Sequence, residues 1–183
     1  MSKVVITGNA SGTGDFTLEA PNSNTDRTLT LPDETGTVLS TATAGVPING
    51  PAFSYNQSAA QTLTSSTTTK LTFTTSEFDT TGGMFASSTF TPTVAGYYQA
   101  SGGLQVAVSA TVMVLYLYKN GALYKQLVSS NPSTLSGGYG SALVYLNGST
   151  DYIEIYANLA TGQALNATAA NVYFQAAMIR SGV

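Results

Sequence analysis

The feature that most constrains the fold of this chain is a series of short runs in which apolar and polar residues alternate, separated by turn residues. Phe53 and Tyr55 alternate with polar neighbours, and residues 152–157 alternate in the same way. Residues 111–119 form the most apolar run, and the Asn-Gly pair at 120–121 after it is the strongest hairpin signal in the chain. From residue 53 onward, turn signals recur every ~8–12 residues, and this spacing is typical of a β-sandwich or jelly roll.

The alternative for residues 106–118 is a buried helix. Their β-branched and aromatic content and the Asn-Gly pair that follows favour a strand instead. We therefore predict an all-β head domain over residues 53–183, with roughly eight to ten short strands. Leu71 and Phe73 are expected in one of these strands, and residues 79–83 in a turn.

The N-terminal part of the chain has a different character. We predict an extended β arm over residues 1–44, joined to the head by a linker over residues 45–52, because residues 41–50 are rich in Ala, Thr, Gly and Pro. The alternating runs of the arm are short, and small isolated hairpins are marginal in water. The arm should therefore become ordered on another surface. Its apolar residues are the predicted attachment residues, namely Phe16, Leu18, Leu29, Leu31, Val38 and Leu39.

The composition excludes several classes of function. The chain has 6 basic and 9 acidic residues, a net charge of −3 and no basic stripe, so we expect no nucleic-acid binding. It lacks cysteine, which excludes disulfides, and histidine, the commonest general base. No basic segment followed by an apolar stretch opens the sequence, so we expect no secretory signal. The longest apolar run, 112–118, is far shorter than the ~20 residues that cross a bilayer, so we expect no membrane insertion.

Two pairs of carboxylates are the candidates for catalysis. Glu77 lies near Asp79, and Asp151 lies near Glu154, and paired carboxylates can hydrolyse glycosides. Both aspartates also sit beside turns, where Asp is common for backbone reasons. We therefore predict no enzymatic activity, no catalytic residue, no cofactor and no metal site. A calcium ion held by Asp79 or Asp151 with loop carbonyls stays open as an alternative.

Residues 73–98 resemble the globular-head jelly roll of the first complement component, a fold shared with tumour necrosis factor. The family has a Phe followed after five residues by Asn or Asp, which Phe73 and Asp79 match. It then has a Phe, five residues, Gly, one residue and Tyr, which Phe90, Gly96 and Tyr98 match. This resemblance implies a jelly roll for the head.

Later segments extend the resemblance to about residue 50 through the end of the chain. The Lys-Asn-Gly of residues 119–121, the pattern of 143–148 and the last strand, 171–176, are each similar to the family. The chain departs from the pattern at Ala100 and Gly102, where the family has aromatic residues. We transfer none of the family's ligand or metal sites.

The resemblance also implies that three copies pack around a three-fold axis. Tyrosines offer wide apolar area at low entropic cost, so they are the candidate contacts between copies, the alternative being that they fill the core of one copy. The candidate trimer contacts are Tyr97, Tyr116, Tyr118, Tyr156 and Tyr173.

The arm resembles a segment found in bacteriophage fibre and virion-decoration proteins, on the match of residues 16–21 and 28–39. This resemblance implies a bacteriophage structural protein located in the virion and assembled in the host cytoplasm. The leading hypothesis is a homotrimeric capsid decoration, or cement, protein whose arm binds the major capsid protein or another virion protein. The alternative is the tip of a tail fibre or head fibre that binds a host surface glycan, a polysaccharide, through loops 129–139 and 159–168.

Overall fold

The structure is a computed structural model that describes residues 50–106, 108, 112–130 and 137–182, together with 11–13, 17, 22, 24–26 and 28. The chain forms two compact units, Met1–Val38 and Leu39–Val183. The predicted attachment residues of the arm lie outside the described residues. Every strand given below belongs to the second unit.

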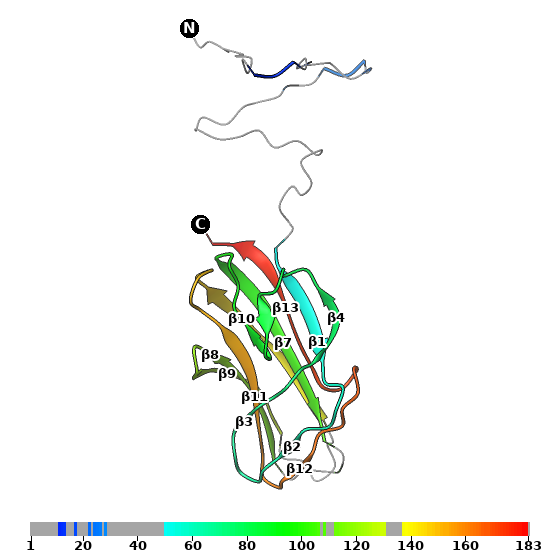
Figure 1. The fold of residues 1–183 in the computed structure, drawn as a ribbon, viewed down its shortest axis with the longest axis vertical. Coiled ribbons are helices and arrows are strands. Elements are labelled where there is room, and N and C mark those ends of the chain that lie inside the picture. Colours follow the sequence, from blue (N-terminus) through cyan, green and yellow to red (C-terminus); the bar gives the residue numbers. More distant parts are fainter. Residues whose placement is uncertain are drawn as a thin grey trace. The chain divides into compact units, whose positions relative to one another are not determined.

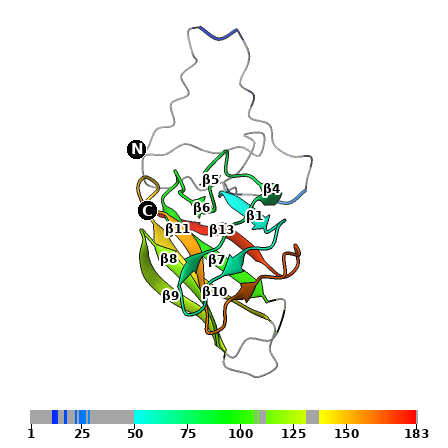
Figure 2. The same ribbon diagram turned by 60° about the horizontal axis from the view of Figure 1, so that its bottom comes forward.

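Two antiparallel sheets form the layers of a sandwich (Figures 1 and 2). The five-stranded sheet has, in spatial order, β10 (Gly137–Leu146), β7 (Gly96–Gln105), β13 (Tyr173–Ser181), β1 (Ala52–Asn56) and β4 (Thr75–Asp79). The six-stranded sheet has β5 (Phe85–Ala86), β6 (Thr89–Phe90), β11 (Ile153–Leu159), β8 (Met113–Lys119) and β9 (Ala122–Ser130), and β3 (Thr69–Lys70) also pairs with β11. The short strands β2 (Thr62–Leu63) and β12 (Gln163–Ala164) pair with each other.

The core lies between the two sheets because alternate residues of each strand point inward. In β7, Tyr98, Ala100 and Leu104 are buried, and in β8 the inward residues include Leu115 and Leu117. An aromatic cluster fills one part of the core around Phe53, whose ring meets the edge of Phe174 at 5.0 Å between centroids. Each fully buried Leu or Phe side chain stabilises the fold by about 1.5–3 kcal/mol.

The hairpin predicted at the Asn-Gly pair is present between β8 and β9. Asn120 and Gly121 have φ angles of 52° and 76°, the left-handed conformation that the tight hairpin turn requires. The strand Met113–Lys119 decides against the helical alternative for residues 106–118. Among the described residues, no helix is long and apolar enough to cross a membrane.

The region between β3 and β4 differs from the sequence prediction. Leu71 and Phe73 are buried, but they lie outside any strand, so the strand predicted for them is wrong. The backbone N–H of Phe73 donates to the Ser88 hydroxyl at 2.7 Å, so a side chain replaces a strand partner. Asp79, expected in a turn, ends the exposed edge strand β4 instead.

Strand bounds and number also differ from the prediction. The described residues form thirteen strands, more than the roughly eight to ten expected, because several are only two residues long and carry no visible alternation. Ala52, predicted in the linker, begins β1.

Candidate functional site: an apolar sheet face

The outer face of the five-stranded sheet is built from the residues of β7, β10 and β13 that point away from the core. In β10 the inward residues Val144 and Leu146 alternate with the outward residues Tyr139, Leu143 and Tyr145. These three side chains are 76%, 46% and 41% exposed, which is unusual for large apolar groups. We call this surface the apolar face.

Tyrosines of neighbouring strands extend the apolar face across β7 and β13. Tyr97 lies opposite Tyr145 in the β7–β10 register, with 5.2 Å between ring centroids. Tyr173 of β13 lies over Gly103 of β7, where an added Cβ would collide with the tyrosine ring. Burial, and then the neighbouring Tyr139, raise the pKa of the Tyr173 hydroxyl. Gly103 thus allows an aromatic ring to lie flat across the sheet.

A shallow groove continues the apolar face toward β4. It has a volume of about 380 Å³, and its lining includes Phe78, Ile179, Gln99 and Gln175. Phe78 and Ile179 are 51% and 59% exposed. The apolar face therefore spans the sheet from β10 to the edge strand β4.

Charge is nearly absent from the central strands of the apolar face and is concentrated on the edge strand β4, which carries Glu77 and Asp79. As the structure describes them, β1, β7 and β10 contain no charged residue, and β13 contains only Arg180. On the edge strand, Glu77 accepts hydrogen bonds from the Ser54 hydroxyl at 2.7 Å and the Asn56 amide at 3.4 Å. Exposed aromatic and aliphatic groups with little charge are typical of the buried centre of a protein interface.

The outer face of the six-stranded sheet has a different organisation. Tyr118 stacks on Tyr156 with 4.1 Å between centroids, and Tyr116 meets Tyr118 edge-on at 6.3 Å. Glu154 forms an ion pair of 2.7 Å with Lys70. Burial, and then Glu154, raise the pKa of the Tyr156 hydroxyl, which donates to Glu154 at 3.3 Å. We call this group the tyrosine ladder.

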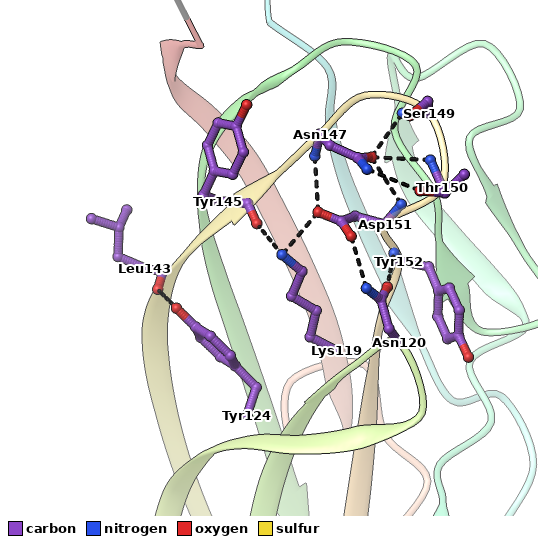
Figure 3. Close-up of polar contacts among 10 residues, drawn as sticks. All are labelled: Lys119, Asn120, Tyr124, Leu143, Tyr145, Asn147, Ser149, Thr150, Asp151 and Tyr152. Carbon is purple, nitrogen blue, oxygen red and sulfur yellow. Dashed lines mark hydrogen bonds and ion pairs between the residues drawn. The ribbon is translucent and has the colours of Figure 1, made fainter.

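A polar cluster joins the β8–β9 turn to the end of β10 (Figure 3). Asp151 accepts hydrogen bonds from the Asn120 amide at 2.7 Å and the Asn147 backbone N–H at 3.0 Å. Lys119 lies 2.8 Å from the Asp151 carboxylate and donates to the Tyr145 carbonyl at 2.8 Å. The Asn120 hydrogen bond, followed by Lys119, lowers the pKa of Asp151. These contacts anchor the backbone of β10 beside the apolar face.

The five predicted trimer contacts divide between the two outer faces. Tyr97 and Tyr173 belong to the apolar face, whereas Tyr116, Tyr118 and Tyr156 form the tyrosine ladder on the other sheet. The sequence prediction missed other members of the apolar face, namely Phe78, Tyr139, Leu143, Tyr145 and Ile179. The alternation of residues 139–145 was the signal that could have identified three of them.

The candidate carboxylates are each bound to other protein groups. Asp79 accepts hydrogen bonds from the Tyr55 hydroxyl at 2.8 Å and the Thr81 N–H at 2.7 Å. Asp151 and Glu154 each pair with a lysine. Within the described ranges, no group of three or more acidic residues could hold a metal ion.

No protein-family model and no curated protein sequence matches this chain. Solved structures do match. The globular domain of zebrafish complement 1qA protein is 17% identical with a TM-score of 0.57, and the match covers 72% of this chain and 99% of that domain. Murine APRIL is 12% identical with a TM-score of 0.57, covering 72% of this chain and 100% of its own.

The Eiger TNF of S. frugiperda is 7% identical with a TM-score of 0.55, covering 74% of this chain and 96% of its own. The head is therefore a jelly roll of the complement and tumour-necrosis-factor type, which confirms the fold predicted from the sequence.

Proposed function

We propose that this protein is a structural protein of a bacteriophage virion, a homotrimer that decorates and braces the capsid. The apolar face is the observation that supports the formation of a trimer. Large apolar side chains gather on it, and Arg180 is the one charged residue that the structure describes in β7, β10 and β13, so a second copy can cover these strands and bury little charge. Closed three-fold symmetry hides such a face on every copy and avoids open fibres.

The arm supplies attachment in this proposal. Its support is the sequence resemblance of residues 16–21 and 28–39 to virion-attachment segments. Short strands of the arm would pair with the edges of shell subunits, and the jelly-roll head would project outward. Once the first arm of a trimer has bound, the second and third arms bind intramolecularly. This multiplies the affinity of the trimer for the particle.

Sedimentation of the full chain tests the trimer. The wild type should sediment as a trimer, and Leu143→Asp on the apolar face should sediment as a monomer with an unchanged circular dichroism spectrum. Leu123→Asp is the matched control, because Leu123 is 56% exposed on β9 of the other sheet. It should remain trimeric. A wild-type monomer at micromolar concentration would contradict the trimer.

Incorporation into particles tests attachment separately. A chain that lacks residues 1–44 should still form trimers but should be absent from purified particles. Normal incorporation of this truncated chain would overturn the role of the arm. Labelling of the head on imaged particles then decides between many copies on the shell and a few copies at a fibre tip.

A further inference from the structure

A depression of about 450 Å³ lies beside the β5–β6 hairpin, away from the apolar face. Its wall and floor are aromatic and consist of Tyr55, Phe73 and Phe85. The hydroxyl residues around it include Thr72, Thr74 and Ser87. Among the described residues, no charged side chain lines it, and none of its lining residues belongs to the apolar face.

The aromatic wall is held in place from two directions. The Tyr55 ring stacks on Phe85 with 4.1 Å between centroids and an angle of 26° between planes. The Tyr55 hydroxyl donates to Asp79 at 2.8 Å, which fixes the far end of the side chain. Phe73 and Phe85 are only 3% and 6% exposed and form a rigid base. A ligand therefore meets a preformed surface and pays little for ordering it.

The hydroxyl groups around the depression can donate and accept hydrogen bonds. The Thr72 hydroxyl donates to Gln61 at 3.2 Å, and the Thr74 hydroxyl lies 2.8 Å from that of Ser58. A hydroxyl also has acceptor capacity that these bonds leave unused. The ligand that suits an uncharged site of aromatic rings and hydroxyls has an apolar ring face and a rim of hydroxyl groups.

The hairpin at the edge of the depression has an unusual turn. Ser87 and Ser88 have φ angles of 50° and 59°, in the left-handed region that favours Asn and Gly. Ser88 has a structural role there, because its buried hydroxyl accepts from the Phe73 N–H at 2.7 Å. Ser87 is exposed, and its hydroxyl has no partner within the described part of the chain. The two-residue loop between β5 and β6 requires these positive φ angles, and it holds the exposed Ser87 hydroxyl at the rim of the depression.

We propose that this depression is a binding subsite for one neutral sugar ring, a hexopyranose. The apolar ring face packs on Tyr55, and the sugar hydroxyls bond to Thr72, Thr74 and Ser87. The subsite does not depend on trimer formation or on the location of the protein in the particle. It is also separate from loops 129–139 and 159–168, where the sequence alone would place glycan contacts.

Saturation-transfer-difference NMR on the full chain tests the subsite. The probes are the methyl glycosides of glucose, galactose and N-acetylglucosamine. At least one should receive saturation at its ring C–H protons, with a dissociation constant of about 1 mM. Tyr55→Leu removes the aromatic surface and should abolish this transfer, whereas Tyr55→Phe keeps the ring and should retain it.

Two further variants separate binding from folding. Ser87→Gly removes a hydroxyl and relieves the strain, so its melting temperature should rise by roughly 2 °C while affinity falls about three-fold. Thr74→Val should also weaken binding about three-fold. Its matched control, Thr75→Val, lies next to the depression without lining it and should bind as the wild type does.

Two outcomes would overturn the subsite. One is the absence of transfer to all three glycosides with folded wild-type protein. The other is transfer that persists unchanged in folded Tyr55→Leu. Neither outcome depends on the sedimentation of the protein. The proposal of a sugar subsite and the proposal of a trimer are therefore tested independently.

Discussion

The two outer faces of the sandwich use the same residue, tyrosine, in opposite ways. On the six-stranded sheet, Tyr118 and Tyr156 stack on each other and lie beside an ion pair of Lys70 and Glu154. On the five-stranded sheet, Tyr139 is 76% exposed and neighbours other exposed apolar groups. The rings of the tyrosine ladder pack on each other within one copy, whereas Tyr139, Leu143 and Tyr145 of the apolar face stay largely exposed.

This difference shows that the content of tyrosine alone does not mark an interface. What distinguishes the faces is whether each ring already has partners and whether charges surround it. Lysine and glutamate accompany the tyrosine ladder, while the three strands β1, β7 and β10 of the other sheet carry none. Depletion of charge is typical of the centre of an interface.

The largest expected effect is on association. Tyr145→Ala removes a large exposed ring from the apolar face and should weaken trimer formation by about 100-fold, since truncating a central interface tyrosine costs about 2 kcal/mol or more where it is a hot spot. Its free energy of unfolding, measured at low concentration where copies are dissociated, should change little. Sedimentation across a dilution series measures the first quantity and urea denaturation the second. If the association constant of Tyr145→Ala were the same as that of the wild type, Tyr145 would not be part of the interface between copies.

Tyr156→Ala should give the opposite result. Loss of the stacked ring should lower the free energy of unfolding by about 2 kcal/mol, because the ring packs on Tyr118 within one copy. Trimer formation should be the same as in the wild type. If this variant dissociated without losing stability, the ladder would be an interface and the comparison above would be reversed.

Acid should weaken the polar cluster beside the apolar face. Because its hydrogen bonds and Lys119 lower the pKa of Asp151, this carboxylate stabilises the fold above its unfolded pKa of 3.8. That contribution is lost as the pH falls through the lower pKa of the folded protein. At neutral pH, Asp151→Asn should be less stable than the wild type by about 1 kcal/mol. Between pH 6 and pH 2, its urea midpoint should fall less steeply than that of the wild type. Parallel curves for the two proteins would contradict this role.

The smallest effect concerns Tyr98, which points into the core while Tyr97 next to it points outward. Burial raises the pKa of Tyr98 from 10.0 to about 12. The neutral hydroxyl is therefore favoured in the folded state, and the stability it contributes is lost as the pH rises from 10 toward 12. Tyr98→Phe removes the hydrogen bond to the Val94 carbonyl, so its free energy of unfolding at neutral pH should be lower by about 1 kcal/mol. That free energy should then fall less than the wild-type value as the pH rises above 10. The difference between the absorbance titrations of the wild type and the variant follows the ionisation of Tyr98.

Much of the fold could be predicted from the sequence because its signals are local. Alternation in residues 152–157 and the Asn-Gly turn at 120–121 each depend on neighbouring residues only. The buried state of Phe73 was also predictable, but its lack of a strand partner was not. That depends on the hydroxyl of Ser88, which is fifteen positions away in sequence and adjacent only after folding.

The candidate site was harder to predict for a related reason. A tyrosine that alternates with apolar residues points away from the core, but the sequence does not say which of the two sheets its strand joins. Tyr116 and Tyr145 have similar local patterns and lie on opposite sheets. The alternation of residues 139–145 indicates that the β10 side chains point outward, but the apolar face that they share with β7 and β13 depends on the strand order.

The bond from Lys119 to the Tyr145 carbonyl has a further consequence for β10. The first half of this strand is rich in small residues, Gly137, Gly138 and Gly140 among them, and such strands are prone to slippage. A shift by one position would turn its tyrosines into the core and expose Val144 and Leu146. By holding the main chain of β10 at Tyr145, Lys119 favours the register in which the tyrosines of this strand point outward.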